Sequence, residues 1–266
     1  MRLSGLWADL RARAATLGRE LTGNVVDSGH AAVYLRQLLR GHHADRGDSV
    51  AAAAASASSV PSGPPVLLIH GYLATRGSLH LLEENLSNNG HVVLGFRFGP
   101  INLGDIRASA ELVARKVESI VAQTGVEQVD VVGHSMGGLV ALYYLKRLGG
   151  ARRVRRLVLL GTPTRGTWSA VFGLLTAPLG LASLQLLPGS PFLRELAEAP
   201  LPPGVDVVSI GALRDWLAPL SSTILDGVRH ISLPTGHTGL LIDREVADTV
   251  TSLLRGPPVD ATPRPT

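Results

Sequence analysis

Apolar runs alternate with helical patterns through the central part of the chain. The runs suited to buried strands are Val66–Ile69, Val92–Phe96, Val129–Val132, Leu157–Leu160, Val205–Ile210 and the weaker Val228–Leu233. Helical patterns lie between most of them, as at Gly104–Gln123 and Gly137–Leu148. This alternation predicts an α/β fold with a mostly parallel sheet and helices on both faces. Because ligands bind such sheets at the carboxyl ends of the strands, functional residues are expected there.

The first part of the chain, residues 1–48, has a different pattern and is predicted to be an N-terminal helical extension. Apolar residues recur at helical spacing in residues 3–21, and a second helical pattern spans Ala31–Leu39. One interpretation is a helix that packs on the main domain or on a partner. The other is peripheral membrane contact through residues 1–40. Charges at Asp9, Arg11 and Arg13 interrupt any signal-peptide core, so we expect a cytoplasmic or peripherally membrane-associated protein.

Two stretches have the composition of segments that do not pack. Residues 49–64 are rich in Ala, Ser and Pro and are predicted to be a linker, and residues 257–266 form a Pro-rich tail. The main domain is therefore expected to span residues 65–256.

Composition narrows the chemistry. The chain of 266 residues has no cysteine, which excludes disulfides, thiolate metal sites and a catalytic thiol. The net charge of +4 does not indicate nucleic-acid binding, because the one dense basic cluster, Arg152, Arg153, Arg155 and Arg156, precedes an apolar run. We interpret that cluster as the surface entry to a strand.

A nucleophile motif follows the third apolar run. Residues 133–138 read GHSMGG, which matches G-x-S-x-G between a predicted strand and a predicted helix. The serine of this motif occupies a strained turn, so small neighbours are needed at Gly133 and Gly137. Ser135 is therefore the predicted nucleophile.

A serine nucleophile needs a base and an acid, which this motif's fold places later in the chain in the order Ser, Asp or Glu, His. Only His230 and His237 follow Ser135. His237 is preferred because it lies in a glycine-flanked loop, whereas His230 lies within a predicted strand. Asp215, shortly after the strand at 205–210, is the predicted acid, with Asp226 as the alternative.

Other acidic residues fit the acid's role less well. Asp206 lies at the start of its strand, and Asp243 begins the last helix, where capping explains it. The backbone amides of Tyr72 and Met136 are the predicted oxyanion donors, one after the first strand and one after the nucleophile. We expect His70 to have a structural role.

Four segments in this order resemble bacterial lipases and esterases of the α/β-hydrolase superfamily: Pro65–Gly71 (PVLLIHG), Gly133–Gly138 (GHSMGG), Gly161–Pro163 (GTP) and Gly236–Leu241 (GHTGLL). The resemblance covers about residues 65–255. It implies an α/β-hydrolase fold and a carboxylic ester hydrolase, a triacylglycerol lipase or carboxylesterase, with Ser135, Asp215 and His237 as its triad.

The segment from Arg165 to Arg194 contains no charged residue between its ends. Pro178 and Gly180 interrupt it, which argues against a membrane span and favours a small apolar helical cap at about residues 165–203. An apolar cap favours acyl chains as substrate. The expected substrate-binding residues are Trp168, Phe172, Leu175 and Leu184.

Other functions remain open at this level. An acyltransferase or a thioesterase would use the same triad, and a non-enzymatic membrane or interaction scaffold would lack one of its members. We expect no metal and no cofactor, because the sequence has no metal-binding cluster or phosphate-binding glycine loop. The expected partner is a lipid or small ester substrate, without nucleic acid. The oligomeric state, the acyl-chain length and the alcohol half of the substrate do not follow from the sequence.

Overall fold

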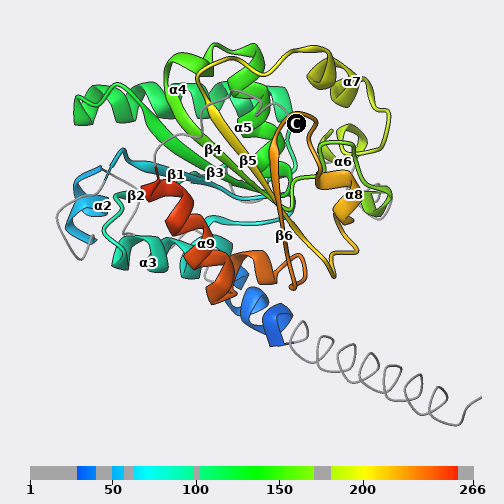
Figure 1. Cartoon of the computed structure of the whole chain (residues 1–266), viewed down its shortest axis with the longest axis horizontal. Helices are drawn as coiled ribbons and strands as arrows, with labels where there is room; N and C mark the ends of the chain where they lie inside the picture. The colour runs from blue at the N-terminus through cyan, green and yellow to red at the C-terminus, as the bar shows by residue number, and fades with distance from the viewer. Residues whose placement is uncertain (1–28, 40–49, 57–62, 99–101, 171–180, 257–266) are drawn as a thin grey trace, which may run out of the picture.

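The core of the molecule is one parallel sheet (Figure 1). The computed structural model describes residues 29–39, 50–56, 63–98, 102–170 and 181–256. Within them six strands pair in the order β2-β1-β3-β4-β5-β6, and every neighbouring pair is parallel. The strands are β1 (Val66–Ile69), β2 (Val93–Gly95), β3 (Val129–His134), β4 (Val154–Leu160), β5 (Asp206–Ala212) and β6 (Arg229–Leu233). The predicted strands and their parallel arrangement are therefore confirmed.

Helices cover both faces of the sheet. Leu67, Ile69 and Leu157 pack toward α4 (Ile106–Thr124) and α5 (Met136–Arg147). The alternate residues of the same strands pack toward α3 (His80–Asn88) and α9 (Arg244–Arg255) on the other face. Because successive side chains of a strand point to opposite faces, a strand covered on both faces must be apolar throughout. This explains the unbroken apolar runs of the sequence.

Shorter elements connect the main ones. They are α2 (Val50–Ser56), η2 (Arg76–Leu79), η3 (Gly150–Arg152), α6 (Ala182–Gln185), α7 (Pro191–Glu198), α8 (Leu220–Thr223) and η5 (Gly239–Leu241). In the described parts of the chain, no helix is long and apolar enough to cross a membrane.

The predicted linker is wrong for residues 50–56, which form helix α2. Ala53 is buried in the core, and the helix contacts β2, α3 and α4. An alanine run has high helix propensity, and its small side chains let the helix lie close to its neighbours. Composition alone suggested a flexible segment because packing partners cannot be read from it. Residues 57–62 and the Pro-rich tail lie outside the described residues.

The helical pattern at Ala31–Leu39 corresponds to a helix at residues 29–39, which we call the N-terminal helix. Tyr34 packs against the core beneath the sheet, on the same face as α9. The earlier apolar pattern, in residues 3–21, lies outside the described residues.

The arginine cluster differs from the predicted surface entry. Strand β4 begins at Val154, so Arg155 and Arg156 lie within it, and Arg156 is buried. Arg155 donates two hydrogen bonds to Asp130, at 2.9 and 2.5 Å, and Arg156 Nε donates to Asp206 Oδ2 at 2.6 Å. The two carboxylates lie on the neighbouring strands β3 and β5. These pairs balance the positive charge inside the protein.

Candidate active site

Ser135 occupies a strained turn between β3 and α5. Its backbone has φ 54° and ψ −128°, a conformation unusual for a residue with a side chain. The neighbouring glycines make the turn possible. A Cβ at Gly133 would lie 2.5 Å from Gly138 Cα, and one at Gly137 would lie 2.4 Å from Ile69 O. The G-x-S-x-G spacing therefore follows from close backbone packing around the serine.

The loop after β1 lies directly against this serine. A Cβ at Gly71 would be 2.9 Å from Ser135 Cβ, so a side chain there would displace the serine. Tyr72 follows Gly71, and Met136 is the first residue of α5. The loop that carries Tyr72 and the helix that begins at Met136 therefore meet at Ser135. The N-terminus of α5 adds a partial positive charge at the same place.

His70 lies in the interior of this loop. It is fully buried, its Nδ1 lies 3.2 Å from Gly71 O, and its ring makes an edge contact with Phe98. This surrounding is the one expected for a structural histidine.

Asp215 and His237 form a hydrogen-bonded couple at the carboxyl ends of β5 and β6. His237 Nδ1 lies 2.6 Å from Asp215 Oδ2. The other carboxylate oxygen, Oδ1, accepts hydrogen bonds from the backbone amides of Leu217 at 2.9 Å and Ala218 at 2.8 Å. Those amides fix the carboxylate, and the carboxylate in turn orients the imidazole.

Gly161 leaves the room that this couple needs. Its φ is +53°, and a Cβ there would lie 3.3 Å from His237 Nδ1, 3.4 Å from Asp215 Oδ2 and 2.6 Å from Leu240 Cδ1. The sequence indicated this glycine only through a family resemblance, within the segment GTP. The structure gives it a physical reason.

The alternative acids and base lie elsewhere. Asp226 is paired with Arg165 at 2.7 Å, and its side chain is 91% exposed. Asp243 caps α9 by accepting a hydrogen bond from a backbone amide, as expected. His230 Nδ1 lies 3.1 Å from Ser209 Oγ, within the sheet. Of the weighed residues that follow Ser135, the structure therefore brings only Asp215 and His237 together.

His134, directly before the serine, contacts His237. Its Nε2 lies 3.2 Å from the carbonyl oxygen of His237, and the two rings are 4.6 Å apart. Because a carbonyl only accepts, Nε2 carries the hydrogen. Burial, and then the charge of a protonated His237, hold the pKa of His134 well below its ordinary value. His134 is therefore neutral near pH 7 and supports the loop that carries His237, a role that the sequence did not indicate.

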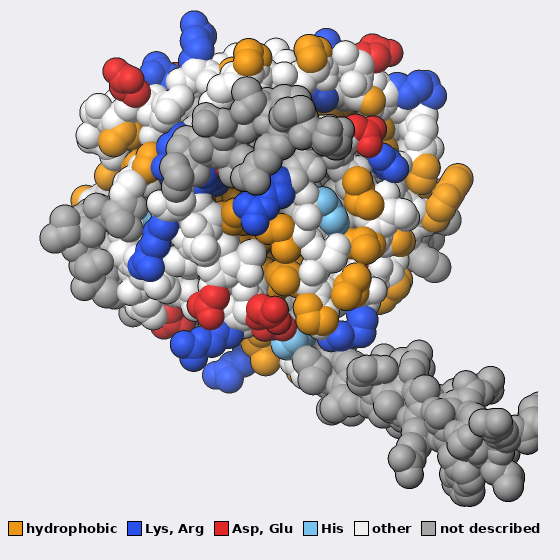
Figure 2. Space-filling view, viewed as in Figure 1, with side chains coloured by type: hydrophobic (Ala, Val, Ile, Leu, Met, Phe, Trp, Pro, Cys, Tyr) orange, Lys and Arg blue, Asp and Glu red, His pale blue; other side chains and the backbone are white. Residues whose placement is uncertain are grey.

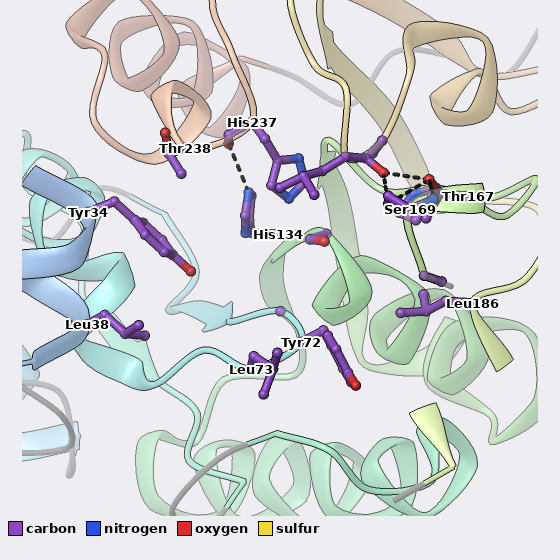
Figure 3. A pocket seen from close by; sticks show the side chains of 16 residues that line it. Tyr34, Leu38, Tyr72, Leu73, His134, Thr167, Ser169, Leu186, His237 and Thr238 are labelled. Carbon is purple, nitrogen blue, oxygen red and sulfur yellow. Dashed lines mark hydrogen bonds between the residues drawn. The ribbon is translucent and has the colours of Figure 1, made fainter. Parts of the chain in front are cut away.

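A cavity of about 390 Å³ opens beside these residues. Ser135 and His237 line it, and most of its other lining residues are apolar or small. The complete set of these other residues is Tyr34, Leu38, Gly71, Tyr72, Leu73, His134, Pro163, Thr167, Ser169, Ala170, Leu186, Leu217, Ala218 and Thr238. Figure 3 shows Tyr34 and Leu38 on one side of the cavity and Thr167, Ser169 and Leu186 on the other. None of these lining residues is Lys, Arg, Asp or Glu.

Two of the expected substrate-binding residues do not line this cavity. Trp168 is 72% exposed and Leu184 is 44% exposed. The hydroxyls of Thr167 and Ser169 both donate to Leu217 O, at 2.6 and 2.7 Å, which turns these two side chains inward. The residue between them, Trp168, therefore points outward. Phe172 and Leu175 lie outside the described residues.

The described part of the predicted cap consists mainly of α6 and α7. Helix α7 packs beside α5, where the Phe192 and Tyr143 rings stack 5.7 Å apart. It therefore contributes no residue to the cavity, whereas Leu186, just after α6, does. Figure 2 shows hydrophobic side chains at the surface on the side of the molecule that carries α6 and α8. An apolar composition did not distinguish the inward side of this insertion from its exposed side.

Tyr34 and Leu38 are cavity residues that the sequence did not identify. Their helical pattern predicted a helix that packs on the main domain or a partner, or that contacts a membrane, because a local pattern does not say which surface the helix meets. Among the described residues, no group of three His, Asp or Glu side chains is arranged to hold a metal ion.

The parallel sheet, the strained serine between β3 and α5, and the Asp-His couple at the strand ends are features of the α/β-hydrolase fold. A model of the alpha/beta hydrolase fold matches residues 64–185. The chain is thus an α/β-hydrolase-fold protein similar to bacterial lipases and esterases, which confirms the resemblance found in the motifs.

Particular relatives agree with this class. The chain is 29% identical over 129 residues to the triacylglycerol lipases of Pseudarthrobacter phenanthrenivorans and Burkholderia plantarii. These matches cover 45% of this chain, 40% of the first relative and 36% of the second, so less than half the length of these curated relatives is matched.

Solved structures show the same fold. Bacillus licheniformis lipase BlEst2 in its mature form superposes with a TM-score of 0.63 at 17% identity, over 74% of this chain and 95% of that one. Aspergillus fumigatus lipase B gives a TM-score of 0.62 at 20% identity, over 82% of this chain and 63% of that one.

Proposed function

We propose that the protein is a serine hydrolase that cleaves carboxylic esters of fatty acids through Ser135, His237 and Asp215. One observation carries the proposal: His237, hydrogen-bonded to Asp215 at 2.6 Å, lines the same largely apolar cavity as a serine held in a strained turn. A serine hydroxyl reacts only when a positioned base removes its proton, and an imidazole oriented by a carboxylate is such a base.

Each group has one role in the reaction. Asp215 accepts the hydrogen of His237 Nδ1, which leaves Nε2 free to accept a proton. His237 Nε2 takes the Ser135 proton while Oγ attacks the ester carbonyl carbon. The amides of Tyr72 and Met136 donate to the oxyanion of the tetrahedral intermediate. The alcohol then leaves with the proton from His237, and an acyl-enzyme on Ser135 remains.

Water completes the cycle. His237 takes a proton from a water molecule, which attacks the acyl-enzyme carbonyl and forms a second tetrahedral intermediate. The intermediate collapses, the fatty acid leaves, and the proton returns to Ser135.

The cavity favours a hydrocarbon substrate over a charged one. Its lining combines aliphatic and aromatic side chains with few polar groups and includes no Lys, Arg, Asp or Glu. The similarity to triacylglycerol lipases supports fatty-acyl esters as the class of substrate.

The test is Ser135→Ala with p-nitrophenyl esters and a fluorophosphonate probe. We expect the variant to lose at least about 10³-fold in kcat and to lose labelling, because the probe reacts only with an activated serine. Ser252→Ala, on the exposed face of α9, serves as the matched control and keeps both signals. Full activity in Ser135→Ala would contradict the proposed triad.

A second measurement separates a lipase from a carboxylesterase. The wild-type protein is assayed on p-nitrophenyl esters of increasing acyl length and on emulsified triglyceride. Activity on the emulsion supports a lipase, and activity confined to short soluble esters supports a carboxylesterase.

A further inference from the structure

The N-terminal helix, residues 29–39, lies at the candidate active site although it precedes the segment that the hydrolase model matches. That model covers residues 64–185. Tyr34 and Leu38 nevertheless line the same cavity as Ser135 and His237. In Figure 3 both side chains approach the cavity from this helix, on the side opposite Leu186.

Contacts with the loop after β1 fix this helix in place. Thr75 Oγ1 donates to Leu38 O at 3.2 Å, and Ser78 Oγ donates to Thr75 O at 2.7 Å. Burial raises the pKa of Tyr34, so the phenol stays protonated at neutral pH. The helix is therefore joined to the loop that carries Tyr72.

A second contact reaches the loop that carries His237. A Cβ at Gly239 would lie 2.8 Å from His30 Nδ1, so the start of the helix lies directly against this loop. The helix thus touches the loops that hold the proposed oxyanion donor and the proposed base. Its position relative to the reacting atoms is defined by both.

The two faces of the helix differ in exposure. Tyr34 and Leu38 are four residues apart and share one face, which points into the cavity. Leu35 and Leu39, also four apart, are 55% and 77% exposed. The helix therefore offers a cavity residue and an exposed residue of the same type, Leu38 and Leu35.

We infer that the N-terminal helix forms a wall of the substrate subsite and that Leu38 limits the length of the hydrocarbon chain that fits there. The inference rests on the proposed ester hydrolysis and adds a determinant of chain length to it. Leu38, Leu73 and the ring of Tyr34 present hydrocarbon to the cavity, and the Tyr34 hydroxyl is the one polar group of these three side chains. An alkyl chain of the ester, from its acyl or its alcohol half, is the ligand that such a wall accommodates.

The test compares Leu38→Ala, Leu38→Trp and the control Leu35→Ala in the full chain. Two series of esters are used, one with increasing acyl length on p-nitrophenol and one of butyrates with increasing alkyl alcohol length. Active serine is counted with a fluorophosphonate so that kcat/KM refers to competent enzyme. Thermal melting checks that each variant is folded.

The two Leu38 variants are expected to move chain-length preference in opposite directions. Each buried methylene contributes about fourfold to affinity. Leu38→Ala enlarges the subsite and raises the long-to-short ratio of kcat/KM by about fourfold or more. Leu38→Trp fills it and lowers that ratio by about tenfold. Leu35→Ala leaves the ratio unchanged.

The series that shifts identifies the half of the ester that the wall contacts. A shift with acyl length assigns the acyl chain, and a shift with alcohol length assigns the alkyl alcohol. Ratios for both Leu38 variants that equal those of Leu35→Ala in both series would overturn the inference.

A binding experiment separates this inference from the proposed function. In a Ser135→Ala background, the affinities of fatty acids from C4 to C14 are measured by calorimetry with and without the Leu38 substitutions. A wild-type protein that hydrolyses no ester contradicts the proposed function, while the fatty-acid series still tests the wall. Affinities whose chain-length dependence ignores Leu38 would overturn the wall even in an active hydrolase.

Discussion

The two ends of the central strands carry similar residues with different partners. Strand β3 has Asp130 near its start and Ser135 directly after its end. Strand β5 starts with Asp206, and Asp215 follows its end by a short loop. Asp206 and Asp215 are both buried, yet Asp206 binds a guanidinium and Asp215 an imidazole. The end of the strand, and thus the partner it meets, decides what each carboxylate does.

At the start of the strands the charges are balanced in pairs. Arg156 and Asp206 have side chains that are only 2% and 5% exposed. Burial raises the pKa of Asp130, and the hydrogen bonds from Arg155 oppose that rise. Such pairs hold neighbouring strands together, and their cost of desolvation is recovered only while both partners are present.

At the carboxyl end of β5, Asp215 binds backbone amides and an imidazole where Asp206 binds a guanidinium. Asp215 is held by two backbone amides and directs its remaining oxygen at His237. An imidazole can gain and lose a proton near neutral pH, whereas an arginine cannot. The comparison therefore predicts that loss of the Asp215 carboxylate, at the carboxyl end of the strands, abolishes activity. Loss of the Asp206 carboxylate, at their start, is expected to lower stability.

The largest effect is expected from Asp215→Asn. An amide at this position no longer holds the tautomer and orientation of His237 that the proposed reaction needs. We expect kcat for p-nitrophenyl butyrate to fall by about 10⁴-fold, with a small change in melting temperature. The control is Asp226→Asn, at the exposed alternative acid, which should change kcat by less than about twofold. Equal losses in both variants would contradict the assignment of the acid.

At the opposite end of β5, Asp206→Asn should act on stability alone. It removes the charge of the carboxylate to which the buried Arg156 donates, and breaking one side of a buried ion pair costs about 3–5 kcal/mol. We expect that loss in the free energy of unfolding measured with urea, and an unchanged kcat per active serine at a temperature where the variant is folded. Asp248→Asn, in an exposed pair with Arg244, should cost less than about 0.5 kcal/mol. A large fall in kcat for Asp206→Asn would break the comparison.

A smaller effect is expected from His91, which precedes β2 by two residues. Burial, followed by the positive charges of Arg255 and Arg155, lowers the pKa of His91. The unfolded chain therefore binds a proton more readily than the folded protein, and stability is lost as the pH falls below about 6.5. His91→Gln should reduce this decline by at most about 1.4 kcal/mol per pH unit.

Urea unfolding of the wild type and His91→Gln at several pH values between 5 and 8 measures this difference. The values at pH 8, where the histidine is neutral in both states, give the cost of the substitution itself. Parallel curves for the two proteins below pH 6.5 would show that His91 does not contribute to acid destabilisation.

The sequence predicted the strands, their mostly parallel direction and the residues that meet at the strand ends. These features are local: an unbroken apolar run indicates a strand covered on both faces, and G-x-S-x-G indicates a turn too tight for side chains. The choice of Asp215 over Asp226 also followed from distance to a strand end, and the structure brings Asp215 to His237. Helix α2 was missed because an alanine-rich segment has no strong amphipathic pattern.

What only the tertiary structure decided is which surfaces meet. The sequence determined that a serine, an aspartate and a histidine lie at one edge of a parallel sheet. Apolar runs predict where each strand ends, and the alternation of strands and helices predicts that the strands are parallel. It did not determine that Tyr34 and Leu38 line the cavity while Trp168 points outward, nor that Gly161 makes room for the Asp-His couple. Those facts depend on contacts between segments far apart in the chain. The free energy of each contact depends on both segments, so the local sequence of one segment does not predict it.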